Sequence, residues 1–245
     1  MKDNSPNYCS INDKECDRRN NPNSCESRLH VEDQSGCGSC WAFAGLASIQ
    51  ISHCMASGKD TIYSKQEILD CSEGECQGGF LGTVVKYLQD FKRLATQDTY
   101  PYEARRVSCR SRSKENAWTG SISKQYRSEQ EHILIRSNSR MKNDEWNTYL
   151  KKIIVRDGAA VIYLKATNMR YTQGVPFRMC QSYRDINHAV IFTGWKLLNG
   201  VPVWIMRNSW GDWWADKGYA YIAIDNSCGS GLYPIDIIHE VHLGE

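Results

Sequence analysis

The sequence predicts an α+β protein built as two lobes. Helical patterns dominate the chain up to Trp118, whereas runs rich in β-branched and aromatic residues dominate the remainder. The turn signal Asn199-Gly200 stands between two of these runs and indicates antiparallel pairing. A chain of 245 residues can form one large domain or two lobes that share a cleft. We therefore expect one domain made of an N-terminal extension (1–33), a mainly helical lobe (34–118) and a mainly β lobe (119–245), whose last residues cross back to the helical lobe.

The extension is rich in Asn and Asp and carries Cys9, Cys16 and Cys25. Because it has few apolar residues to bury, disulfides are expected to hold its shape. Its start, MKDNSPNYCS, lacks the apolar core of a signal peptide. We expect any targeting segment or pro-segment to lie outside this sequence.

The first long helix is expected from Cys40 to about Gly58. Its apolar residues lie nearly all round the helix axis, which is typical of a buried helix. Ser39 is expected to cap its start, and Gly58 stands where a C-terminal glycine should.

Two shorter helices are expected next, at 64–70 and at 81–91. Ser64 and Glu67 have the spacing of a capping box, which marks the start of the first of them. The segment TYPY at 99–102 indicates a loop, because the residue before a proline avoids helical geometry.

The second half of the chain is expected to begin with one amphipathic helix, at 144–156, ended by Asp157-Gly158. Strands are expected to follow where β-branched and aromatic residues cluster, at 159–166, 188–195, 201–208 and 218–224. No internal repeat or low-complexity tract interrupts this order.

Composition excludes several classes of function. The formal net charge is +2 and the charges are interleaved, so no block predicts binding to nucleic acid or to a charged membrane surface. The basic run 105–114 is interrupted by a cysteine and by serines, as in a solvated loop. No stretch approaches the ~18 apolar residues of a membrane span.

The chain contains eleven cysteines, which points to disulfides and an oxidising compartment. Because the number is odd, at least one cysteine has no partner within the chain. We therefore look for five bridges and one thiol that stays free.

The motif SGCGSCW (35–41) allows four interpretations: a redox couple, half of a zinc site, two bridged cysteines, or a bridge beside a reactive thiol. A redox couple expects a strand that feeds the motif, and the preceding ESRLHVEDQ is short and polar. A zinc site needs a second pair of ligands at suitable spacing, and Cys71 and Cys76 are close enough in sequence to keep that interpretation open. Cys40 begins a helix, where free N–H groups and the helix dipole favour a thiolate.

A nucleophilic thiol also needs a base. Of the six histidines, only His188 begins an apolar strand. Downstream, RNSWG places Asn208 just past a strand and Trp210 beside it. An amide can hold an imidazole in one tautomer, and an indole can shield that contact from water.

Together these patches resemble the papain-like cysteine peptidases. The matching motifs are DQSGCGSCWAF, SKQEILDC, CQGG, YPY, NHAV, RNSWG and GY, which run from Gln34 nearly to the end of the chain. His188 lies 148 residues after Cys40, within the spacing seen around papain-type nucleophiles, whereas Asn208 lies 168 after it, slightly beyond. The resemblance implies a helical left lobe, an antiparallel β-barrel right lobe and an active site in the cleft between them.

By the same resemblance, Cys40 is the nucleophile and His188 is its base and then its acid, as a resting thiolate–imidazolium pair. Asn208 would orient the imidazole and Trp210 would cover it. Gln34, six residues before the nucleophile, would donate its side-chain amide to the oxyanion beside the Cys40 N–H group.

The resemblance also implies a disulfide pattern. It pairs Cys37 with Cys76, Cys71 with Cys109, and Cys180 with Cys228. Four cysteines then remain besides Cys40, and they allow three pairings, of which we predict Cys9–Cys16 and Cys25–Cys54.

An extended peptide is expected to pair with backbone groups of Gly78 and Gly79. The resemblance places the main specificity pocket, apolar and selective for the second residue before the scissile bond, at Phe80, Leu81, Ile186 and Tyr233. Asn187 and Trp210 are expected to contact the substrate as well. Trp213 and Ala215 stand where small glycines are common, and should reshape the leaving-group side of the cleft.

The extension and the segment from Asp157 to Gly174 are similar to the apicomplexan serine-repeat antigen peptidase-like domains, some of which carry serine as the nucleophile. The expectation is a monomeric endopeptidase, secreted or held in the lumen of a secretory, lysosome-like or parasitophorous compartment, which needs no metal or cofactor and whose cleft takes a peptide, a protein, a pro-segment or an inhibitor. A pseudo-peptidase that binds peptides with little turnover is the alternative, and a disulfide oxidoreductase is a more distant one. No N-x-S/T sequon is present.

Overall fold

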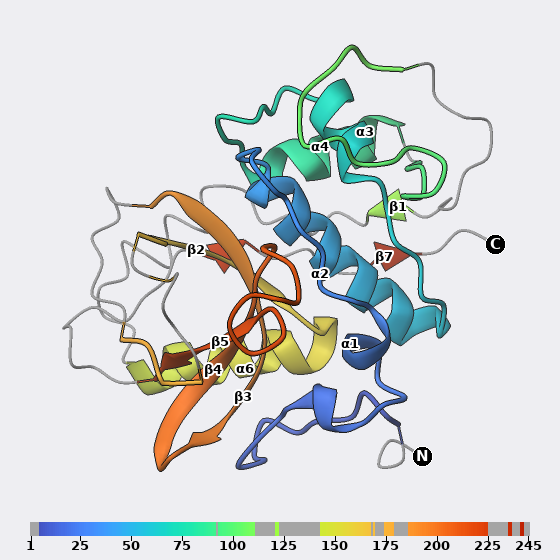
Figure 1. The fold of residues 1–245 in the computed structure, drawn as a ribbon. Coiled ribbons are helices and arrows are strands. Elements are labelled where there is room, and N and C mark those ends of the chain that lie inside the picture. Colours follow the sequence, from blue (N-terminus) through green and yellow to red (C-terminus); the bar gives the residue numbers. More distant parts are fainter. Residues whose placement is uncertain are drawn as a thin grey trace.

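The computed structural model describes residues 5–91, 93–110, 121–122, 143–167, 169, 174–178, 186–224, 235–236 and 241–242. Most helices gather on one side of the molecule, and a twisted antiparallel sheet lies on the other with one further helix packed against it (Figure 1). The predicted α+β class with two lobes is confirmed. The helical elements are η1 (Arg18–Asn20), α1 (Cys25–Arg28), α2 (Cys40–Ser57), α3 (Lys65–Cys71), α4 (Leu81–Phe91) and α6 (Asn143–Asp157).

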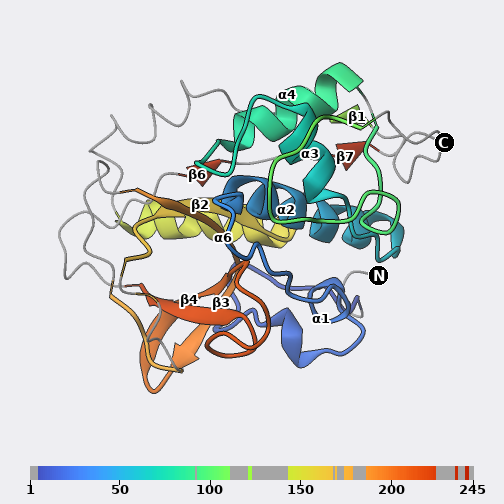
Figure 2. The same cartoon turned by 45° about the horizontal axis from the view of Figure 1, so that its top comes forward.

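Helix α2 lies at the centre of the molecule. It lies between α3 and α4 on one side and the sheet on the other (Figure 2). Its residues are buried on every face, as the sequence predicts. Gly58 ends it in the left-handed region at φ 76° and donates its N–H to the carbonyl of Cys54.

The prediction that the Ser39 side chain caps the start of α2 is wrong. The Ser39 hydroxyl bonds the Tyr102 hydroxyl at 2.6 Å, while the first helical N–H groups go to the Ser39 carbonyl. Of the two hydrogen bonds in the predicted capping box of α3, only one forms. The Ser64 hydroxyl accepts the Glu67 N–H, but the Glu67 carboxylate bonds the Tyr87 hydroxyl and the Ala95 N–H instead. In both cases a residue distant in sequence competes for the capping group.

The main sheet has the strand order β5-β4-β3-β2-β6, all antiparallel. Asn199 and Gly200 join β3 to β4 with positive φ at both positions, which is the predicted two-residue hairpin turn. The strand pairings of the described residues do not close this sheet into the predicted barrel. The strands are β2 (Ala160–Leu164), β3 (His188–Leu198), β4 (Val201–Arg207), β5 (Tyr219–Ala223) and β6 (Ile235–Asp236).

Strand β3 is buried on both faces. Ala189 and Ile191 belong to the core around α2, and Val190 and Phe192 belong to the core around α6. A second, two-stranded sheet pairs β1 (Ser121–Ile122) with β7 (Val241–His242) beside α4 and α2. The last described residues therefore lie against the helical part of the molecule.

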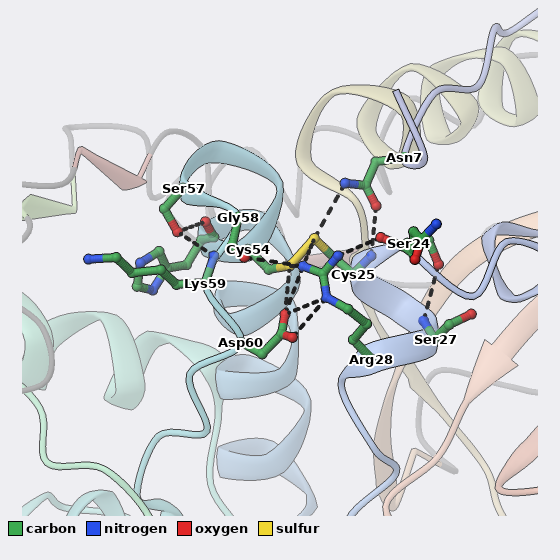
Figure 3. Close-up of a disulfide and its surroundings, with 12 residues drawn as sticks. Asn7, Ser24, Cys25, Ser27, Arg28, Cys54, Ser57, Gly58, Lys59 and Asp60 are labelled. Atoms are coloured by element: carbon green, nitrogen blue, oxygen red, sulfur yellow. Dashed lines mark hydrogen bonds and ion pairs between the residues drawn. A yellow bond between two sulfur atoms is a disulfide. The ribbon is translucent and has the colours of Figure 1, made fainter. Parts of the chain in front are cut away.

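The extension is fastened to both parts of the molecule. Cys16 exchanges two backbone hydrogen bonds with Trp195 of β3, next to an irregularity in the sheet register. A side chain at Gly194 would come within 1.9 Å of the Cys16 carbonyl, so this close approach requires glycine. The Cys25–Cys54 disulfide ties α1 to α2, and Arg28 bridges the Cys54 sulfur and Asp60 beside it (Figure 3).

Four of the five predicted disulfides are present: Cys9–Cys16, Cys25–Cys54, Cys37–Cys76 and Cys71–Cys109. Cys180 and Cys228, the fifth predicted pair, lie outside the described residues. Among the described cysteines only Cys40 is free, as expected.

Candidate active site

The free thiol of Cys40 stands at the N-terminus of α2. The neighbouring Cys37–Cys76 disulfide and a 2.7 Å hydrogen bond from Gly38 to the Cys76 carbonyl hold the loop that leads into the helix. A Cβ atom at Gly38 would lie 2.2 Å from that carbonyl oxygen. The two cysteines of the motif therefore do different work: one fixes the loop and the other remains a thiol.

His188, the first residue of β3, is buried and oriented by Asn208. Its Nε2 lies 2.7 Å from Asn208 Oδ1, the same atom that accepts the Ser209 N–H at 2.9 Å. Because that atom accepts a backbone N–H, it is the amide oxygen, and Nε2 must be the donor. The neutral imidazole consequently carries its proton on Nε2 and leaves the Nδ1 lone pair available as a base.

Trp210 covers this contact. Its indole stacks on the His188 ring with centroids 4.9 Å apart, and Trp214 meets it edge to face at 5.1 Å. Both indoles come from the segment between β4 and β5. They exclude water from the His188–Asn208 hydrogen bond, which strengthens it.

Gln34 is held by a residue that the sequence reasoning missed. The Ser209 hydroxyl donates to Gln34 Oε1 at 2.7 Å, and Gln34 Nε2 donates to the Cys37 carbonyl at 2.8 Å. These contacts fix which end of the amide is nitrogen, and one of its two hydrogens has no acceptor among the described residues. Ser209 stands within the RNSWG motif, so the motif contained this information but gave it no role.

Burial opposes charge on both the Cys40 thiol and the His188 imidazole. It lowers the pKa of His188 to about 4 and raises the pKa of Cys40, against backbone N–H groups of Ala189, Trp41 and Cys40 itself that favour the thiolate. An isolated charge on either group is thus disfavoured. The resting thiolate–imidazolium pair stays a prediction, to which the structure adds that burial opposes either charge when it stands alone.

This burial predicts the acid side of the pH profile. His188 must be unprotonated to accept the thiol proton, so kcat/KM should fall only as the pH drops through about 4 and should be retained above it. The measurement is kcat/KM against pH with a peptide that has no ionisable side chain. An acid limb near 6.5, the ordinary histidine value, would show that the imidazole is solvated during catalysis.

The two glycines expected to pair with substrate differ. Gly78 already exchanges both backbone hydrogen bonds with Glu75, at 3.1 Å each. Gly79 has no backbone partner within the described part of the chain, and a Cβ there would lie 2.6 Å from the Trp41 ring. Trp41 directly follows Cys40, so this packing brings the Gly79 backbone close to the free thiol.

The expected pocket residues are only partly brought together. Phe80 is 68% exposed, Leu81 is fully buried and Ile186 is half-buried. Tyr163 of β2, which the sequence reasoning did not select, accepts the Leu81 N–H at 3.0 Å and meets the Phe80 ring at 6.4 Å between centroids. Its alternating strand position could have suggested an inward orientation, but not this partner.

The two other predicted contact residues differ in what the structure shows. Asn187 is exposed, with its side-chain oxygen bonded to the Ala166 N–H. Tyr233 lies outside the described residues. Within the described ranges no group of three or more potential metal ligands is found, and no helix there is long and apolar enough to cross a membrane.

Comparison with known proteins gives a consistent relationship. Residues 13–235 match the family model described as papain family cysteine protease. A viral cathepsin of Heliothis zea nuclear polyhedrosis virus is 30% identical over 204 residues, which are 81% of this chain and 50% of the relative. The chain therefore spans about half the length of that curated relative.

Solved structures agree. SERA5E from Plasmodium falciparum superimposes with a TM-score of 0.80 at 25% identity, covering 97% of this chain and 99% of that one, and confirms the predicted similarity to the serine-repeat antigen group. The SERA5 proenzyme of the same organism has a TM-score of 0.80 at 21% identity, over 98% of this chain and 69% of that one. With a family match over most of its length, and a free cysteine and an oriented histidine at the matching motifs, the chain belongs to the papain family of cysteine proteases.

Proposed function

We propose that the protein is a cysteine endopeptidase that hydrolyses peptide bonds through an acyl-enzyme on Cys40. The observation that carries this proposal is the His188 tautomer. Asn208 holds the proton on Nε2, so the Nδ1 lone pair is kept for a thiol proton. A histidine that served only packing would not need this orientation.

The first half of the reaction forms the acyl-enzyme. Nδ1 of His188 takes the proton from the Cys40 sulfur as that sulfur attacks the substrate carbonyl. The oxyanion that forms accepts hydrogen bonds from the Cys40 N–H and the free Gln34 amide hydrogen. When the C–N bond breaks, His188 returns its proton to the leaving amine.

The second half releases the product. Water gives a proton to Nδ1 and attacks the thioester carbonyl, and the same two donors stabilise the second oxyanion. The thiolate leaves and recovers the proton from His188, which restores the starting state. No step uses a metal or another cofactor.

Substrate binding is proposed to follow the cleft beside Cys40. The free backbone groups of Gly79 suit an extended peptide. Phe80 and Ile186 keep exposed apolar surface for the second residue before the scissile bond, whereas Leu81 and Tyr163 are buried and pack beneath this contact.

The setting is proposed to be a secreted or luminal one. Four disulfides within the described residues favour an oxidising compartment. The likeness to a proenzyme supports a pro-segment as a partner for the cleft. Peptide or protein substrates and a monomeric state complete this proposal.

A peptide-binding domain with little turnover is the second candidate. Two features favour it. Burial raises the pKa of Cys40, which opposes formation of the nucleophilic thiolate. The Gln34 Nε2 group already donates one hydrogen bond to the Cys37 carbonyl, at 2.8 Å, instead of to an oxyanion. Both features would persist if the cleft bound peptides without cleaving them.

A peptidyl epoxide separates the candidates. We expect one equivalent to alkylate Cys40, located by peptide mapping, and to abolish hydrolysis of fluorogenic peptides in proportion to the label. Labelling without any hydrolysis would favour the binding domain. An adduct on Cys37 instead would support a redox couple and overturn the proposal.

A further inference from the structure

Trp213 presents an exposed indole beside the active site. At 75% exposure it is the most exposed large hydrophobic side chain in the described part of the chain. It is nevertheless fixed: its Nε1–H donates to Asp33 Oδ2 at 3.3 Å, and the ring lies over Gly211. A Cβ at Gly211 would come within 2.6 Å of Trp213 Nε1, so glycine permits this placement. Such a rigid aromatic surface is a ready contact for a ligand.

The position of Trp213 relates it to the reaction. Gln34 N donates to the Ser209 carbonyl at 2.8 Å, and Gly211 N donates to the Glu32 carbonyl at 3.1 Å. These two paired segments, 32–34 and 209–211, also carry the oxyanion donor and the indole that covers His188. Trp213 therefore projects from the same unit, next to both.

The leaving-group side of the cleft can be assigned from the proton transfer. His188 must reach the departing amine, so the chain that follows the scissile bond begins beside His188. Trp210 stacks on that imidazole, and the following turn, residues 211–213, is where this chain would pass next.

Two carboxylates give this surface a negative charge. Asp33 and Asp212 are both exposed, and neither has an ion-pair partner among the described residues. Asp33 accepts hydrogen bonds only from neutral donors, the Ser35 N–H on Oδ1 and the Trp213 indole on Oδ2, so its charge is not neutralised. Asp212 directly precedes Trp213 in the chain. An indole face attracts a cation within ~6 Å of its centre, and tryptophan does so best. A guanidinium can also stack on the ring while it pairs with a carboxylate. The combination selects basic side chains and repels acidic ones.

We propose that Trp213, Asp33 and Asp212 form a subsite, here named the acidic indole subsite, that binds an arginine or lysine side chain following the scissile bond. The proposal rests on the proposed function for the identity of the ligand as a peptide substrate. It adds a charge preference on the side of the cleft that the apolar pocket does not reach.

The test measures peptide binding to Cys40→Ala protein by fluorescence anisotropy. Peptides carry arginine, citrulline or glutamate, in turn, at each of the first three positions after the scissile bond. At one of these positions we expect arginine to bind about three- to tenfold more tightly than its uncharged analogue citrulline, and glutamate to bind least. The arginine advantage should shrink as ionic strength rises.

Matched variants locate the effect. Trp213→Ala in the Cys40→Ala background should remove the arginine advantage, and Asp212→Asn should reduce it while leaving the indole in place. Phe91→Ala, which removes another exposed aromatic ring at the end of α4, should retain it.

Equal affinities for arginine and citrulline at all three positions, or an advantage that survives Trp213→Ala, would overturn the subsite. Because binding is measured on a protein without the nucleophile, the result does not depend on turnover. Wild-type protein that fails to hydrolyse any peptide would refute the proposed function and leave the subsite result standing.

Discussion

Replacing His188 with alanine should lower kcat/KM for a fluorogenic peptide on the order of 10⁴-fold. The variant loses both the base that accepts the Cys40 proton and the acid that protonates the leaving amine. Burial raises the pKa of Cys40, so little thiolate would form without that base. The rate of Cys40 alkylation by iodoacetamide should fall with hydrolysis, because both need the thiolate.

His30→Ala is the matched control, because the His30 side chain is exposed and takes no part in the proposed chemistry. It should retain wild-type kcat/KM. Added imidazole should partly restore hydrolysis by His188→Ala but should not affect the control. Retention of more than about a tenth of wild-type activity by His188→Ala would contradict the assigned base, since general-base catalysis alone contributes at least ~100-fold.

The second large effect is on stability. Replacing Arg18 with methionine should lower the free energy of unfolding by about 3–5 kcal/mol, because buried acceptors lose a charged donor. The buried Arg18 guanidinium donates to the carbonyls of Asn7, Ile154, Gly158 and Thr193. It therefore joins the extension to the end of α6 and to β3 at once.

Urea unfolding of the disulfide-intact protein measures this loss, with Arg105→Met as the control. The Arg105 side chain is 74% exposed, and its salt bridge to Glu103 is a surface pair worth little. The control should stay within about 0.5 kcal/mol of wild type. A similarly small change for Arg18→Met would show that water or another donor can satisfy the carbonyls.

Local sequence patterns predicted the four longest helices and four of the strands, most of them to within a residue or two, but not the short elements η1, α1, β1, β6 and β7. The start and end of α2, the hairpin at Asn199-Gly200 and the glycine ends of α2 and α6 each follow from short-range chemistry. The errors arose where a distant group offered a better partner. Ser39 bonds Tyr102, 63 positions away, and Glu67 reaches Tyr87 and Ala95.

The candidate site also has a part that short motifs could predict and a part that depends on contacts between distant residues. Motif spacing was enough to select Cys40, His188, Asn208 and Gln34. It could not reveal that Ser209 holds the Gln34 amide, because that contact joins residues 175 positions apart. Nor could it separate Gly78 from Gly79, whose difference is a matter of which backbone groups are already bonded.

By itself the sequence determined the fold class, the family resemblance and the bridge-and-thiol interpretation of SGCGSCW, and it selected the residues that we propose to react. These depend on residue type, period and count, all of which are properties of the chain. Only the tertiary structure decided the tautomer of His188, the burial that opposes an isolated charge on Cys40, and the fixed indole of Trp213 beside Asp33. Each of these depends on distance and solvent exclusion between segments remote in sequence, and such quantities exist only once the chain has folded.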